Sequence, residues 1–129
     1  MEDIKKEILS IEENIVKAFN KGKIDEIMQY FNEDLLAFSS TAHERLGGLK
    51  EFKKTFEYYL DQSQNMEYQI SSPLVKVFDN AAFITFYWVV ALTGVSSRKE
   101  IHGRGSHFFI KRDGDWKIVH EHYSRAIHA

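Results

Sequence analysis

Cysteine is absent from this sequence of 129 residues, and proline occurs only once. Without thiols the chain has no disulfide bonds, no thiolate metal ligands and no cysteine nucleophile. The single proline, Pro73, lacks the backbone N–H that a sheet ladder requires. We therefore expect the strand that contains it to lie at an edge and to be bulged or broken there.

A strong charge of either sign is also missing. The formal charge is −2, and the Lys and Arg residues are scattered rather than clustered, which disfavours a nucleic-acid partner. The first residues, MEDIKKEILSIEEN, carry charges where a signal peptide needs an apolar core. The longest apolar run, residues 81–92, is too short to span a bilayer. We therefore expect a cytoplasmic protein with neither membrane nor nucleic acid as a partner.

Aromatic residues are abundant: they make up 14% of the chain, and ten of them are Phe. Aromatic side chains supply large buried areas and suit either a deep core or an apolar pocket. The length fits one domain over residues 1–129, which is large enough to bury a substantial core.

Three helices are predicted in the first half of the chain. The first carries an apolar stripe at helical spacing, with Asp3 as its expected N-cap and Gly22 at its end. That stripe consists of Ile4, Ile8, Ile11, Ile15 and Phe19. A second, shorter helix places Ile24, Ile27, Met28 and Phe31 on one side, and a third is marked by Leu49, Phe52, Phe56, Tyr59 and Leu60 and ends near Asp61. Between these last two we expect a short strand over residues 35–40 and a polar loop over 41–48.

Four strands are predicted after Met66, where the apolar period changes to two. Residues 66–78 form the strand with Pro73, and residues 81–93 are almost all apolar, as in a central strand covered on both faces. Turns are expected at 79–80 and 94–99. The last two strands, 100–111 and 115–125, are joined by Arg112-Asp113-Gly114, a strong hairpin signal. The length of these strands predicts that they bend, and Gly103 and Gly105 are the expected positions of the bend.

This order predicts an α+β fold in which a curved antiparallel sheet wraps around the N-terminal helices, with the element order ααβαββββ. Such a sheet leaves a cone-shaped space that is open at one end. Its outer face would stay apolar, and an exposed apolar face usually finds a partner. We therefore expect a homodimer through the outer face.

Four histidines lie close together near the C-terminus: His102, His107, His120 and His122. His120 and His122 point to the same side of one strand, which could supply half of a metal site with a third imidazole from the neighbouring strand. A cupin-like site would also need a Glu a few residues later, where this chain has Tyr123, Ser124 and Arg125. We therefore predict that the histidines pack in the sheet or at an interface, without a metal or another cofactor.

The stretch from Arg112 to Ser124, RDGDWKIVHEHYS, resembles the closing hairpin of the SnoaL-like branch of the nuclear-transport-factor-2-like superfamily. The resemblance extends to YFNEDLLAF (30–38), GLKEFKKTF (48–56) and AAFITFYWVV (81–90), and so to nearly the whole chain. It is closest to the association domain of calcium/calmodulin-dependent protein kinase II and small bacterial relatives. The superfamily holds isomerases, dehydratases, cyclases and non-enzymatic oligomerisation domains, so the resemblance implies a fold rather than a reaction.

The resemblance also implies where a pocket would lie. The association domain lines its pocket with arginines from three strands, and the matching positions here are Trp88, His107 and Tyr123. An arginine clamp for a carboxylate is therefore not expected. An aromatic cavity remains, suited to a larger, flatter and less charged ligand. Phe52 and Phe56, four residues apart on the third helix, either cover this cavity or belong to the plain core, and the same alternative holds for Trp88.

Acid–base chemistry would need an ionisable group in that cavity. The ketosteroid-isomerase branch has its general base near Ser39 and Ser40 here, and no Asp or Glu lies between residues 81 and 99, so that mechanism is disfavoured. Glu121 shares an expected strand face with Val119 and Tyr123, and burial there could raise its pKa. His107 on the next strand would be its partner. Alternatively, Glu121 pairs with Arg104 or Arg125 at the rim.

Three functions are therefore open. The first is a small-molecule-binding homodimer with an aromatic pocket lined by Phe52, Phe56, Trp88, His107, Glu121 and Tyr123. The second is a lyase or isomerase, of the dehydratase or cyclase type, that acts on an apolar or polyketide-like substrate, with Glu121 and His107 as candidate catalytic residues. The third is an oligomerisation module, which we disfavour because we expect no partner domain on this chain.

Overall fold

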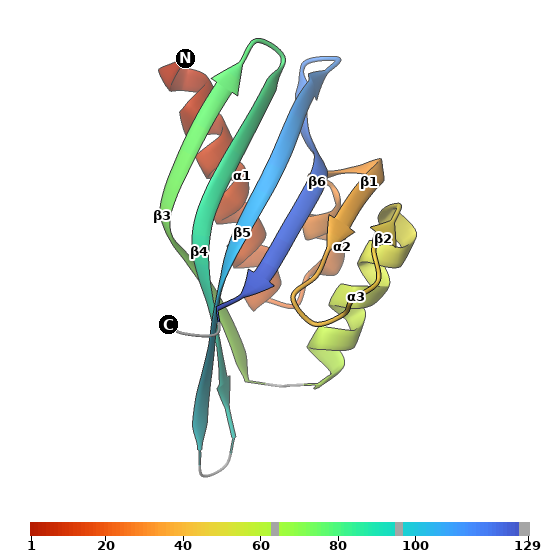
Figure 1. Cartoon of the computed structure of the whole chain (residues 1–129), viewed down its shortest axis with the longest axis vertical. Coiled ribbons are helices and arrows are strands. Elements are labelled where there is room, and N and C mark those ends of the chain that lie inside the picture. Colours follow the sequence, from red (N-terminus) through yellow and green to blue (C-terminus); the bar gives the residue numbers. More distant parts are fainter. Residues whose placement is uncertain (63–64, 95–96, 127–129) are drawn as a thin grey trace.

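The computed structural model describes residues 1–62, 65–94 and 97–126, and Figure 1 shows how their elements are arranged. The helices are α1 (Glu2–Asn20), α2 (Ile24–Met28) and α3 (Leu49–Gln62). The strands are β1 (Phe31–Phe38), β2 (Leu46–Gly47), β3 (Met66–Phe78), β4 (Ala81–Thr93), β5 (Arg98–Arg112) and β6 (Asp115–Arg125). They form one sheet in the order β2-β1-β6-β5-β4-β3. The predicted α+β fold with a curved sheet is confirmed, with β2 as an additional strand.

Helix α1 lies behind the sheet in the view of Figure 1 and buries the apolar stripe that the sequence predicts. Ile8, Ile15 and Phe19 are all less than a tenth exposed. The chain leaves the helix through Gly22, whose φ of 70° is easily adopted without a Cβ. The predicted cap at Asp3 is wrong: the helix begins at Glu2, and no side chain caps it.

The segment between α2 and α3 differs from the prediction. Phe31, expected on the second helix, begins β1, which ends at Phe38 rather than at residue 40. Phe31 is 4% exposed and packs in the core, so burial of its ring fixes the start of the strand. The predicted loop over 41–48 contains β2, in which Leu46 and Gly47 pair with Ala37 and Leu36 of β1.

Strand β3 is an edge strand, and its register shifts between Ser71 and Leu74, which confirms the predicted irregularity around Pro73. The closing hairpin is confirmed as well. Asp113 and Gly114 both have positive φ, as in a type I′ turn. The turn expected at 94–99 includes residues 95–96, which lie outside the described residues. All strand pairs are antiparallel except that of β1 with β6, which is parallel.

The two faces of the sheet differ in burial. On β4, Ala82, Ile84 and Trp88 face the helices and are almost completely buried, whereas Tyr87 on the other face is 58% exposed. The expectation that this strand is covered on both faces is therefore wrong for the chain by itself, because all helices pack on one side. Within the described part of the chain, no helix combines the length and apolar character needed to span a bilayer.

Gly103 and Gly105 of β5 give space to rings on the inner face. A Cβ on Gly103 would lie 2.1 Å from the ring of Trp88, and one on Gly105 would lie 2.6 Å from the ring of Phe86. The glycines therefore set how closely these rings approach the sheet, in addition to any role in its curvature.

Candidate functional site

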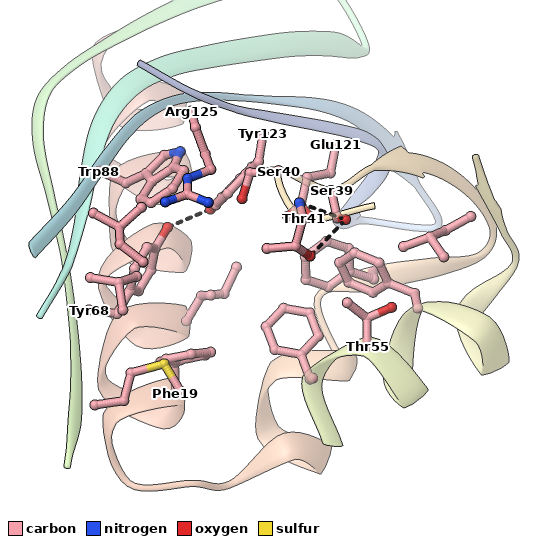
Figure 2. Close-up of a pocket in the computed structure, with 18 of the residues that line it drawn as sticks. Phe19, Ser39, Ser40, Thr41, Thr55, Tyr68, Trp88, Glu121, Tyr123 and Arg125 are labelled. Carbon is pink, nitrogen blue, oxygen red and sulfur yellow. Dashed lines mark hydrogen bonds between the residues drawn. The ribbon is translucent and has the colours of Figure 1, made fainter. Parts of the chain in front are cut away.

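A cavity of about 260 Å³ lies between the inner face of the sheet and the helices. Its walls come from α1, α3 and the strands β1 to β6, and most lining side chains are apolar. Figure 2 shows Phe19, Tyr68 and Trp88 on one side of this space and Thr55 on another. Thr41 and Arg125 are the exposed members of the lining and mark its open end. Among the described lining residues Glu121 is the only carboxylate.

Five of the six residues expected to form a pocket line this cavity. They are Phe52, Phe56, Trp88, Glu121 and Tyr123. His107 is not among the lining residues: it is completely buried and lies behind Glu121. Whether any of these side chains binds a ligand stays a prediction.

A bulge in β6 determines which of its residues face the cavity. Ile118 pairs with Phe109 and His120 with Phe108, so Val119 is the extra residue between two ladder positions. The bulge brings Ile118 and Glu121 to the same buried face. The prediction that Val119 shares the face of Glu121 and Tyr123 is therefore wrong.

Glu121 and His107 form part of a buried chain of three ionisable side chains. The Nε2 atom of His107 lies 2.6 Å from Oε1 of Glu121, and its Nδ1 atom lies 2.5 Å from Oε2 of Glu12 on α1. The three residues are 0–6% exposed. The predicted partnership of Glu121 with His107 is thus present in the structure, whereas the alternative pairing with Arg104 or Arg125 is not found among the described residues.

This arrangement shifts the pKa values of its members. Burial alone lowers the pKa of His107, but the charges and hydrogen bonds of Glu12 and Glu121 outweigh burial and raise it to about 10. Burial raises the pKa of Glu121, and its contacts with His107 oppose that rise. Two carboxyl groups therefore enclose the imidazole away from solvent, and both favour its protonated form.

Two tyrosine hydroxyls meet at the cavity wall. The hydroxyls of Tyr68 and Tyr123 hydrogen-bond to each other, as Figure 2 shows, and burial raises the pKa values of both phenols well above their ordinary range. The ring of Tyr123 stacks on Trp88 at a centroid distance of 5.7 Å. The side chain of Asn20 accepts a hydrogen bond from the backbone N–H of Tyr68 and donates one to its carbonyl, which fixes β3 against α1.

The sequence interpretation missed Glu12 and Tyr68. A signal for Glu12 exists, because positions 8, 12, 15 and 19 follow helical spacing and place this carboxyl on the apolar stripe. Tyr68 lies on the inward side of the alternating pattern in residues 66–70. That position alone indicates no function, because a buried tyrosine is an ordinary core residue.

The other three histidines lie on the outer face of the sheet. His120 contacts the carbonyl oxygen of Leu36 and the rings of Phe38 and Phe108, and His122 also contacts Phe38. His102 lies 3.3 Å from Glu100 near the end of the β4–β5 hairpin. Over residues 1–62, 65–94 and 97–126, no group of three His, Asp or Glu side chains is placed to hold a metal ion.

Comparisons with known proteins agree with this architecture. A model of the SnoaL-like domain matches residues 8–128. No curated protein matches the chain. An NTF2-like protein of unknown function from Pseudomonas putida KT2440 superposes with a TM-score of 0.89 at 18% identity, over 96% of this chain and 87% of that one.

Two further solved structures carry more specific descriptions. A candidate dehydratase of the NTF2-like family from Streptomyces avermitilis has a TM-score of 0.88 at 10% identity, over 98% of this chain and 99% of that one. A candidate association domain of calcium/calmodulin-dependent protein kinase II from Xanthomonas campestris has a TM-score of 0.82 at 18% identity, over 95% of this chain and 88% of that one. At these identities the likeness establishes the fold alone.

Proposed function

The chain belongs to the family of SnoaL-like domains, and from this premise we propose that it binds a small, mostly apolar molecule in the cavity between helices and sheet. The observation that carries the proposal is an apolar cavity of about 260 Å³ with one carboxylate among its described lining residues. Ligand sites are typically apolar concavities with a few well-placed polar groups. Phe52, Phe56, Trp88 and Tyr123 supply the apolar walls, and Glu121 supplies the polar group.

Binding of p-xylene tests this proposal with two neighbouring variants. Val90 lines the cavity, whereas Val89 is on the opposite face of the same strand. V90F fills the cavity and is expected to abolish the binding that NMR titration detects in the wild-type protein, while V89F retains it. Equal binding by both variants, or no binding by the wild-type protein, contradicts the proposal. Native mass spectrometry of the purified protein then seeks the natural ligand as an added organic mass.

A second function, acid–base catalysis of the lyase or isomerase type, is favoured by the buried chain Glu12–His107–Glu121. Glu121 lines the cavity and has its proton affinity altered by burial, as general acids and bases often do. The Streptomyces avermitilis protein is described as a candidate dehydratase, and dehydration is a reaction that such a group would catalyse. A polyketide-like or other apolar carbonyl compound is the substrate class that fits the walls.

Proton removal next to a carbonyl tests this second function without knowledge of the natural substrate. In D₂O the wild-type protein is expected to speed deuterium exchange at the methyl ketone of 4-methylacetophenone, as followed by NMR. E121Q is expected to lose that activity because it removes the base. Exchange at the rate of buffer alone in the wild-type protein would exclude this chemistry for simple aryl ketones.

The partner in this proposal is a second copy of the chain, bound through the outer face of the sheet. Large apolar side chains remain exposed there, among them Leu36, Leu74, Phe78, Tyr87 and Phe108. Contiguous exposed apolar surface on a folded chain marks an interaction site.

A further inference from the structure

The chain Glu12–His107–Glu121 needs an explanation beyond packing. Ionisable groups are costly to remove from water, and apolar residues of similar size often stabilise a core equally well. Glu12 is 1% exposed and occupies a position of the apolar stripe that any aliphatic residue would fill. Only Glu121 of the three lines the cavity. Because the chain ends at a cavity-lining residue, its charge can act on a molecule in the cavity.

The protons of this chain can be counted from its geometry. Each ring nitrogen of His107 faces one carboxylate oxygen, and each contact requires one proton between its two atoms. Two protons shared by two carboxyls and one imidazole leave one negative charge in excess. In the described part of the chain, the second oxygen of Glu121, Oε2, has no hydrogen-bond partner. That oxygen is available to a molecule in the cavity.

We propose that Glu12 is a positioning residue that keeps His107 protonated and oriented, so that Glu121 presents a carboxylate oxygen to the cavity and selects ligands that donate a hydrogen bond. This inference rests on the proposed binding function and specifies its ligand class: a mostly apolar molecule with a hydroxyl or N–H group at its inner end. His107 does not touch the ligand and acts through Glu121.

The surroundings of His107 assign this role to Glu12 rather than to another charge. Apolar rings pack around the imidazole from three strands, namely Phe31 of β1, Phe86 of β4 and Phe109 of β5. The other ionisable groups near the chain are Tyr68 and Tyr123 in the cavity wall and His120, whose charge acts on Glu121 from the outer face of β6. Glu12 and Glu121 both favour the imidazolium through their charges and hydrogen bonds. Without the charge of Glu12, an imidazole in this apolar shell favours the neutral form.

The variant E12Q removes the charge and keeps the shape. Its amide oxygen can still accept from Nδ1–H, so the ring orientation is retained. The Nε2 atom then becomes an acceptor, and the proton of the second contact moves to Glu121. The group that the cavity presents changes from a carboxylate to a neutral carboxylic acid. E13Q is the matched control, because Glu13 is the next residue of α1 and is exposed.

Nitrogen-15 NMR of the His107 ring tests the role of Glu12 without any ligand. At pH 8, above the ordinary histidine pKa of 6.5, both ring nitrogens of the wild-type protein and of E13Q are expected to be protonated. E12Q is expected to show one unprotonated nitrogen while its amide spectrum remains that of a folded chain. Two protonated nitrogens in E12Q, or an unprotonated one in the wild-type protein, would overturn the proposal.

Binding of p-cresol and p-xylene tests the ligand class, since the two molecules differ by a hydroxyl in place of a methyl group. A hydrogen bond to a charged acceptor predicts about tenfold tighter binding of p-cresol by the wild-type protein. E12Q and E121Q are expected to reduce this preference to about twofold. Equal affinities in the wild-type protein would overturn the ligand class alone. Failure of both compounds to bind would overturn the proposed function and the ligand class with it, while the NMR test still decides the role of Glu12.

Discussion

Glu12, a buried side chain on α1, determines the electrostatic environment of His107 and Glu121 on the sheet. His107 and Glu121 by themselves would form a neutral hydrogen-bonded pair or a simple ion pair. Glu12 adds a second carboxylate on the far side of the imidazole, at 2.5 Å from Nδ1. The result is a chain of charges whose members are almost completely removed from water, where electrostatic interactions are strong.

Stability should fall with rising pH between 6.5 and about 10 because of His107. A group whose pKa is higher in the folded than in the unfolded chain stabilises the fold fully below the unfolded value and loses this effect as pH rises through the folded value. The raised pKa of Glu121 has the same sign of effect, but it begins at the ordinary carboxyl pKa of 4.5. Urea unfolding at a series of pH values measures the slope, and E12Q is expected to flatten it. Parallel curves for E12Q and the wild-type protein would contradict this assignment.

The hydroxyl pair of Tyr68 and Tyr123 gives a second residue-scale prediction. Y123F removes one hydroxyl and leaves that of Tyr68 without its partner at the cavity wall. We expect a loss of about 1 kcal/mol in the free energy of unfolding, which is typical of a buried hydrogen bond. Chemical denaturation measures it. Y87F, at a position that is 58% exposed, is the control and should change stability little.

At the scale of the elements, β5 and β6 owe their shape to glycines and to a bulge. Gly103 brings the strand within contact of the Trp88 ring, and a Cβ there would also lie 2.2 Å from the backbone oxygen of Ser124. A Cβ at this position would be blocked by backbone on one side and by the Trp88 indole on the other, so it could not be accommodated by a small shift. The position therefore fixes both the cavity wall and the β5–β6 pairing.

G103A should consequently destabilise the protein by about 3 kcal/mol, the upper part of the range for overpacked cores. Thermal unfolding measures the loss, and weaker binding of p-xylene is expected because Trp88 must move. G47A is the matched control, since the nearest atom to its new Cβ would be a flexible Leu36 carbon at 3.9 Å. A similar change in both variants would show that the ring contact is not the cause.

The periodic elements and the register shift around Pro73 could be predicted from the sequence, whereas the β6 bulge and strand β2 could not. Helices and long strands follow from apolar spacing, and the closing hairpin from Asp113-Gly114, because these signals are local. The β6 bulge has no such signal: Val119 is a good strand residue, and its extra position arises from pairing with β5. Strand β2 is two residues long and forms only because β1 lies beside it.

The candidate site shows the same division. The alternating pattern placed Glu121 and His107 on neighbouring strands, but the β6 bulge sets them opposite each other, since the register before the bulge would pair His107 with His120. Glu12 is 95 positions away from His107 in the chain, and only the packing of α1 on the sheet brings the two together. A carboxyl on an apolar stripe is a visible anomaly, yet its partner cannot be identified before the tertiary structure is known.

At the scale of the whole molecule, the outer face of the sheet carries a continuous row of rings. Phe78 stacks on Phe83, Phe83 contacts Phe108, and Phe108 contacts His120, at centroid distances of 5.4–6.1 Å. The row crosses β3, β4, β5 and β6, and the helices lie on the opposite side (Figure 1). Self-association through a second copy would bury this row and leave the cavity on the inner face unobstructed.

F108E tests that association. Phe108 is 45% exposed near the middle of the row, so a carboxylate there would be desolvated in a dimer but hydrated in a monomer. Analytical ultracentrifugation is expected to give twice the mass of one chain for the wild-type protein and the mass of one chain for F108E. S10E adds the same charge on the exposed side of α1 and should remain dimeric. If F108E keeps the wild-type mass with an intact fold, the interface lies elsewhere and the row of rings requires another partner.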